Sequence, residues 1–377
     1  MRRASAILIA LAFALGPGVA QASDGPASDA GTFVATGAPS EFRFMHAAAP
    51  LPDGRVLVTG GWYNFTELAE AWDPATGTFE PAGSLIAIRA RHTMTTLEDG
   101  RVLVVGGPGG PESEGFTAAA ELWDPASETF TPAGVLATGR AMHTATLLDD
   151  GRVLVIGGTD GNGAVAAAEA WDPATGTFQP AGSLGQARAS HTATLLSDGR
   201  VLVTGGWDWA TEPALASSEI WDPATETFAP TSSLLQPRES HTATLLDDGQ
   251  VLIVAGRSRS SADQAGATAE RWDPVSESFR PAGTLAEARL MHSANLLPDG
   301  RVLVVGGLDP ATEETMIATA EIWDPSTTTF GPAGTLTGGT FGHTATLLPD
   351  GRVLIVGSLY EDEDFVSMAE IWEPVEE

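Results

Sequence analysis

One sequence motif, repeated seven times, constrains the fold of this chain more than any other feature. His143 to Gly158 reads HTATLLDDGRVLVIGG, and nearly the same letters begin again at His191. A histidine opens each copy, and these histidines are the only ones in the sequence, spaced 46 to 51 residues apart: His46, His92, His143, His191, His241, His292 and His343. A repeat of about 50 residues is typical of a propeller blade or a solenoid unit.

Each copy predicts four short antiparallel strands. A strand such as HTATLL leads into an Asp-Gly pair, which favours a two-residue hairpin, and then into a β-branched strand such as RVLVV. A loop of variable length follows, then a strand that ends in Trp-Asp-Pro, a turn, and a fourth strand of the form TFxPAG. Helical periodicity is absent from the repeat, and four strands in every 50 residues is the pattern of a propeller blade.

The sizes of the side chains favour a propeller over an open solenoid. The first strand of the third copy carries the small residues Thr144, Ala145 and Thr146, whereas its third strand carries Trp171. Blades converge on a central axis, so inner strands have less room than outer ones. An open solenoid would need no such gradient.

The two ends of the repeat region predict how the ring closes. The last copy stops at AEIWEPVEE, where a fourth strand would follow, while Gly31-Thr32-Phe33 lies ahead of the first copy. Phe33 precedes His46 by 13 residues, and the same spacing holds for Phe79, Phe130, Phe178, Phe228, Phe279 and Phe330 before their histidines. We therefore predict that residues 32–37 pair beside Ile371-Trp372. The expected fold is an all-β, seven-bladed propeller over residues 31–377, closed by an N-terminal outer strand.

The repeat resembles the kelch family. Kelch units carry a double glycine after the second strand, an aromatic residue before Asp-Pro in the third, and an R-x-x-H segment ahead of the next blade. The double glycines here are Gly60-Gly61, Gly106-Gly107, Gly157-Gly158, Gly205-Gly206 and Gly306-Gly307, with Ala255-Gly256 and Gly357-Ser358 as departures. The aromatic residues are Trp72, Trp123, Trp171, Trp221, Trp272, Trp323 and Trp372. The resemblance implies a propeller, a fold that hosts binding modules, scaffolds and a few enzymes.

The N-terminus predicts export. Two arginines, an apolar run and the small residues Ala20-Gln21-Ala22 are typical of a secretory signal in residues 1–22, cleaved after Ala22. Residues 23–30 are expected to be a short linker. No later stretch approaches the roughly 20 apolar residues of a membrane-spanning helix, so we expect a secreted or periplasmic protein that does not insert into a membrane.

The net charge and the absence of cysteine limit the classes of partner and of stabilising bond that this chain can have. The formal net charge is −30, and the sequence contains no lysine and no cysteine. Such an acidic chain repels nucleic-acid phosphates and anionic lipids, so neither is an expected partner. Disulfides and thiolate metal sites cannot form. We expect a soluble monomer, although an acidic patch for a basic partner remains an alternative reading of the charge.

The seven histidines suggest a metal site, but their spacing favours architecture. Facing sheets lie about 10 Å apart, whereas a zinc ion holds each histidine nitrogen at about 2.0 Å. Histidines of neighbouring blades would rarely share one ion. We expect each imidazole to pack at a blade entrance and to bond to the backbone, and we expect neither a metal nor a cofactor.

An arginine three residues before the histidine is open to two interpretations. The position is occupied by Arg43, Arg89, Arg140, Arg188, Arg238 and Arg289, and by Thr340 in the last copy. A glutamate recurs two residues before each tryptophan: Glu70, Glu121, Glu169, Glu219, Glu270, Glu321 and Glu370. The opposite charges predict structural ion pairs in each blade. Alternatively, the arginines form a ring at the channel mouth that binds a carboxylate or sulfate.

The loops between second and third strands carry every tryptophan and tyrosine that lies outside the repeat pattern. We expect these loops to share one face with the R-x-x-H segments, because both flank the same strand ends. Their candidate ligand-binding residues are Trp62, Tyr63, Trp207, Trp209 and Tyr360, accompanied by Phe65, Phe116 and Phe365. Blades one and seven are neighbours in a closed ring, so Trp62, Tyr63 and Tyr360 could form one patch that anchors a ligand. Alternatively, the rings fold back and cap their own loops.

Two functions are compatible with these patterns. The first is an exported binding module that recognises a protein or glycan through the loop face. The second is a sugar-active enzyme, such as an epimerase or lyase, with charged residues at the channel mouth. Galactose oxidase, a kelch-type propeller enzyme, uses a tyrosine crosslinked to cysteine, which this chain cannot form. An enzyme should show an apolar-walled pocket with two convergent carboxylates, and a binding module a broad aromatic surface.

Overall fold

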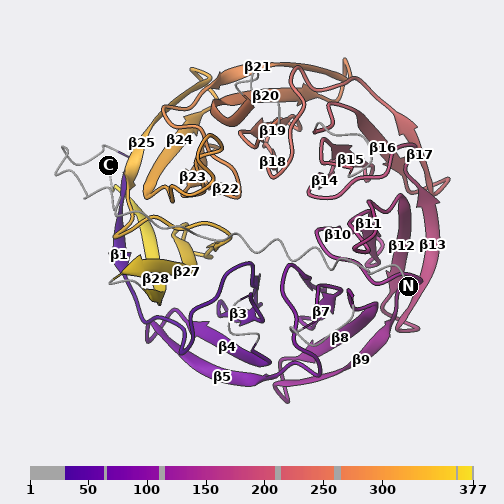
Figure 1. The fold of residues 1–377 in the computed structure, drawn as a ribbon, viewed down its shortest axis with the longest axis horizontal. Helices are drawn as coiled ribbons and strands as arrows, with labels where there is room; N and C mark the ends of the chain where they lie inside the picture. Colours follow the sequence, from indigo (N-terminus) through magenta and orange to yellow (C-terminus); the bar gives the residue numbers. More distant parts are fainter. Residues whose placement is uncertain are drawn as a thin grey trace, which may run out of the picture.

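The chain forms a closed ring of seven four-stranded antiparallel sheets (Figure 1). The structure is a computed structural model that describes residues 30–62, 66–109, 115–208, 214–258, 265–361 and 364–375. The predicted all-β, seven-bladed propeller is therefore confirmed. The predicted signal sequence, residues 1–22, lies outside the described residues, as does the predicted linker except for Ala30.

Six blades are built from consecutive strands. Blade one holds β2 to β5 (Ala47–Pro50, Val56–Thr59, Leu68–Asp73, Thr78–Ser84) and blade two β6 to β9 (Thr93–Thr96, Val102–Val105, Ala119–Asp124, Thr129–Val135). Blade three holds β10 to β13 (Thr144–Leu147, Val153–Ile156, Ala167–Asp172, Thr177–Ser183) and blade four β14 to β17 (Thr192–Leu195, Val201–Thr204, Ser218–Asp222, Thr227–Pro230). Blade five holds β18 to β21 (Thr242–Leu245, Val251–Val254, Thr268–Asp273, Ser278–Thr284), preceded by η1 (Ala265–Ala267). Blade six holds β22 to β25 (Ser293–Leu296, Val302–Val305, Thr319–Asp324, Thr329–Thr335).

Blade seven joins the two ends of the chain. Its inner strands are β26 (Thr344–Leu347), β27 (Val353–Glu361) and β28 (Asp364–Pro374), and its outer strand is β1 (Gly31–Ala35). Strand β1 pairs antiparallel with β28, Phe33 opposite Trp372 and Val34 opposite Ile371. Figure 1 shows indigo β1 beside yellow β28 at the rim. The predicted closure of the ring is confirmed.

Packing between blades explains the order of residue sizes along the repeat. First strands lie next to one another around the axis, so only small side chains fit there. Second strands such as β11 are buried at all four positions, because a neighbouring sheet covers each face. In five blades the third-strand tryptophan donates its indole N–H to a carbonyl of the preceding blade, as Trp171 does to Ala133 at 2.8 Å. A large aromatic side chain thus fills the wider gap between outer strands.

Within the ranges that the structure describes, no helix is both long and apolar enough to cross a membrane.

The role of β1 in closing the ring can be tested by a substitution that adds a single methyl group to this strand. A Cβ at Gly31 would overlap the indole of the fully buried Trp372, so Gly31→Ala should lower the free energy of unfolding by about 1–3 kcal/mol. Gly331→Ala is the matched control, because it lies on the outer strand β25 with open space around its Cβ. Its stability should stay within about 0.5 kcal/mol of wild type. Thermal and urea unfolding measure both, and an unaffected Gly31→Ala would contradict closure by β1.

Candidate functional site

The R-x-x-H segments and the variable loops lie on one face, as predicted. In five of the six blades that have the arginine, the residue after it makes an antiparallel bridge to the start of the loop that follows the second strand. Phe44 bridges Trp62, Ala141 bridges Thr159, and Ala189 bridges Trp207. We call this side of the ring the loop face.

The recurring arginines do not line this face. The side chains of all six are at most 1% exposed, and each forms an ion pair with the glutamate of its own blade. The nitrogen–oxygen distance is 2.7 Å for Arg140–Glu169 and 2.9 Å for Arg188–Glu219. The structure therefore supports the ion-pair interpretation. The proposed ligand role is corrected for Arg43, Arg89, Arg140, Arg188, Arg238 and Arg289, because burial leaves their guanidinium groups inaccessible.

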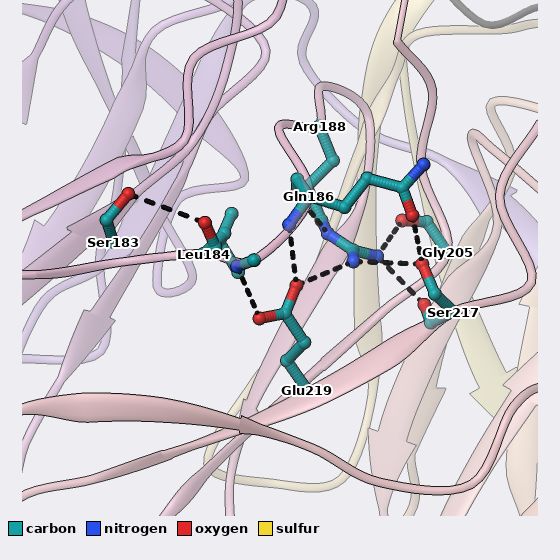
Figure 2. A network of polar contacts seen from close by, with 8 residues as sticks. Ser183, Leu184, Gln186, Arg188, Gly205, Ser217 and Glu219 are labelled. Carbon is teal, nitrogen blue, oxygen red and sulfur yellow. Dashed lines mark hydrogen bonds and ion pairs between the residues drawn. The ribbon is translucent and has the colours of Figure 1, made fainter.

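Each pair ties the connection between two blades to the end of a hairpin (Figure 2). One guanidinium nitrogen of Arg188 donates to the carbonyls of Gly205 and Ser217, at 2.7 and 2.8 Å, and another reaches Glu219. The second carboxylate oxygen of Glu219 accepts the backbone N–H of Gly185 at 2.7 Å. Burial lowers the pKa of Arg188, and the charge of Glu219 opposes that shift.

Blade seven shows what happens where the arginine is missing. In blade three the carbonyls of Gly157 and Ala167 accept from Arg140, and the β11–β12 ladder stops at Ile156 opposite Ala168. Thr340 replaces the arginine in blade seven, where the β27–β28 ladder continues from Gly357 opposite Met368 to Glu361 opposite Asp364. Blade seven thus lacks both the arginine and, at Ser358, the second glycine of the repeat, and its hairpin extends further on the loop face.

Because these arginines are buried in ion pairs, removing one should destabilise the fold of its blade rather than weaken the binding of a ligand. We expect Arg140→Ala to lower the free energy of unfolding by about 3–5 kcal/mol, because it leaves Glu169 buried without a counter-charge. Arg101→Ala, which breaks the exposed pair with Asp99, should change it by less than about 1 kcal/mol. Urea unfolding compares the two variants. Equal, small effects would mean that the buried pair does not stabilise the blade.

The seven histidines connect neighbouring blades. Each is buried, and its Nε2 lies 2.9–3.1 Å from a hydroxyl of the preceding blade: Thr344, Thr59, Thr93, Thr144, Thr192, Thr242 or Ser293. The predicted place at the blade entrance is confirmed, and the partner of each Nε2 is a hydroxyl of the preceding blade rather than the backbone. In the part of the chain that is described, no three potential ligands form a metal site.

Burial and the nearby arginines lower the histidine pKa values. The pKa of His143 falls to about 3 and that of His343 to about 4, while that of His92 is held well below its usual range. Burial is the largest cause in each case, followed by the positive charge of a neighbouring arginine. The imidazoles are therefore neutral in the folded protein at neutral pH.

This predicts a steep loss of stability in mild acid. Between its lowered folded pKa and its unfolded value near 6.5, each histidine is protonated only in the unfolded chain, so stability is full above about pH 6.5 and falls as pH drops. Each contributes a slope of up to about 1.4 kcal/mol per pH unit. Urea unfolding between about pH 5 and 6.5 measures the sum. His143→Gln should reduce the slope by about one proton, and an unchanged slope would contradict the buried neutral state.

A closed circle of backbone hydrogen bonds surrounds the channel mouth. The residue before each histidine donates its N–H to the carbonyl of the equivalent residue in the preceding blade, at 2.8–3.5 Å, all the way round. This mouth ring consists of Met45, Arg91, Met142, Ser190, Ser240, Met291 and Gly342. Every member has a positive φ, from 47° to 56°, and every one is partly exposed. The ring therefore presents six side chains and Gly342 at the mouth, on the loop face.

An aromatic cluster covers the mouth ring at blades six, seven and one. Phe44 stacks on Phe341 with ring centroids 5.1 Å apart and meets Phe365 edge-on at 4.7 Å. Tyr360 meets Phe365 edge-on at 5.1 Å. We define the aromatic cluster as Phe42, Phe44, Met45, Trp62, Leu290, Met291, Leu308, Met316, Phe341, Tyr360 and Phe365.

The structure brings some of the predicted aromatic residues together and separates others. Trp62 and Tyr360 belong to the aromatic cluster, and both are partly exposed. Trp207 is 5% exposed and pairs with Ala189 in blade four, so it packs on its own blade. Tyr63 and Trp209, with Phe65, lie outside the described residues.

Of the eleven residues of the aromatic cluster, the sequence pattern had indicated only Trp62, Tyr360 and Phe365. The middle residues of R-x-x-H are apolar and large in Phe44, Leu290 and Phe341, but alanine in blades two to four. That difference could have indicated the site, because a position that varies within a conserved repeat is free to take a separate role. The position of Met45 and Arg91 also varies between blades, and it was not predicted either.

Comparisons with known proteins agree with the architecture. A family model described as the Kelch motif matches residues 140–185. The structure of a fungal alcohol oxidase of the AA5 family, in complex with copper, is 19% identical with a TM-score of 0.72, over 92% of this chain and 76% of that one. The structure of YjhT is 12% identical with a TM-score of 0.61, over 78% of this chain and 98% of that one. No curated protein matches the sequence.

Proposed function

Taking the chain as a kelch-type β-propeller, we propose that it is an exported binding module that recognises a protein through its loop face. The aromatic cluster is the principal contact surface. The observation that carries the proposal is the gathering of aromatic and methionine side chains from three blades beside the mouth ring. The predicted signal sequence supports export.

The composition of the cluster favours a protein over a glycan. Methionine side chains are flexible and polarisable, so Met45, Met291 and Met316 can adapt to an irregular apolar partner. The rings of Phe44, Phe341 and Phe365 stack mainly on one another. The experiment described below therefore includes glycans as the alternative class of ligand.

Two carboxylates among the described residues of the loop face do not favour the enzyme alternative. Acid–base catalysis needs carboxylates that are free to exchange protons. Glu239, beside the mouth ring, and Glu313 are both bound to Arg257, at 2.7 and 2.5 Å. The copper of the similar fungal oxidase does not fit either, since the histidine Nε2 atoms are bound to hydroxyls and the sequence has no cysteine.

An array of purified proteins and glycans, probed with the full chain, tests the proposal. Tyr360→Ala should weaken retention of any protein ligand at least about tenfold, because aromatic anchors at the centre of an interface dominate binding. Val275→Ala is the control, since Val275 is 93% exposed in a turn on the opposite face and should leave binding unchanged. Thermal unfolding should be similar for both variants. Retention of glycans alone, or loss only with Val275→Ala, would contradict the proposal.

A further inference from the structure

One member of the mouth ring differs from the other six. Arg91 is the only charged residue in the circle, where the remaining positions hold methionine, serine or glycine. Its backbone follows the same path, with φ of 47° against 52° for Met45 and 54° for Met142. The arginine is therefore not needed for the turn, which methionine makes equally well.

The guanidinium of Arg91 has sulfur neighbours and no carboxylate partner. Its Nε lies 2.7 Å from the sulfur of Met45, and another nitrogen lies 3.3 Å from the sulfur of Met142. Across the described ranges, the only other arginine without an ion pair is Arg271, which lies 5.6 Å above the indole of Trp323. Arg91 thus stretches along the ring between blades one and three without an ion pair of its own.

This arrangement is costly unless a ligand uses it. A thioether is a weak acceptor, so the two sulfur contacts do not replace the hydration of a cation. Burial lowers the pKa of Arg91 to about 10, while the charge of Glu239 opposes that shift, so the side chain is still protonated at neutral pH. A carboxylate at the mouth would recover the lost interaction through the guanidinium fork.

We propose that Arg91 is a carboxylate-binding site at the channel mouth, and that its ligand carries an apolar group next to the carboxylate. Met45 joins the two halves of the site, because it contacts Arg91 and belongs to the aromatic cluster with Phe44. The inference deepens the proposed function, on which it rests, by naming the chemistry that the loop face recognises.

The charges favour a carboxylate over a phosphate. A single arginine balances one negative charge, whereas a phosphate brings about two into a protein whose formal net charge is −30. Screening limits the repulsion of distant carboxylates to about 8 Å at physiological salt, so Arg91 dominates at the mouth. Glu239, the acidic group that acts on Arg91, is itself bound to Arg257.

Arg91→Met gives a conservative test, because methionine occupies the same ring position in blades one, three and six. Calorimetric titration of the full chain would compare 3-phenylpropanoate with its amide, and an acetylated peptide Ala-Ala-Phe as free acid with its amide. Wild type should prefer the acids by about tenfold or more, the value of one charge-assisted interaction. The preference should disappear in Arg91→Met and persist in Arg101→Met, which removes an arginine from the opposite face.

The outcomes separate this inference from the proposed function. If both acids bind more tightly than their amides, the ligand of the site is the C-terminal carboxylate of a peptide chain. If only phenylpropanoate does so, the ligand is a small carboxylate. Tighter binding of phenyl phosphate, absence of any acid preference, or a preference that survives in Arg91→Met would overturn the site. If Tyr360→Ala still abolishes retention of a protein ligand in those cases, the binding module stands and only the carboxylate site fails.

Discussion

The buried arginine–glutamate pair is the interaction on which the rest of this propeller depends. In six blades it fastens the connection from the preceding blade to the end of the β-hairpin, and its guanidinium donates to two carbonyls at that end, as Arg140 does to Gly157 and Ala167. A charge buried with satisfied hydrogen bonds is costly to break, so the pair holds each blade entrance in one place. The mouth ring is positioned by these entrances.

Blade seven departs from this rule. Its β27–β28 ladder is longer than in the other blades and carries Tyr360 and Phe365 onto the loop face. The same blade receives β1 from the N-terminus, so the segment between β1 and β2 brings Phe42 and Phe44 to those rings. Closure of the ring and assembly of the aromatic cluster are therefore one structural event.

The mouth ring combines uniform backbone with variable side chains. Seven inter-blade hydrogen bonds and seven histidine–hydroxyl contacts keep the backbone alike in every blade. The side chains are then free to differ, as Arg91 does between Met45 and Met142. A rigid frame with replaceable side chains suits recognition, because changing one position leaves the fold unaffected.

Residue patterns alone determined the period, the four strands of each blade, the count of seven and the pairing of Phe33 beside Trp372. All of these follow from local spacing that the chain repeats, and repetition averages out local ambiguity. Only the tertiary structure decided that Arg140 is buried while Arg91 lies at the mouth, and that Phe44, Phe341 and Phe365 meet. Burial and contact depend on which segments, distant in sequence, the closed ring brings together. A local sequence pattern does not specify which distant segments will meet.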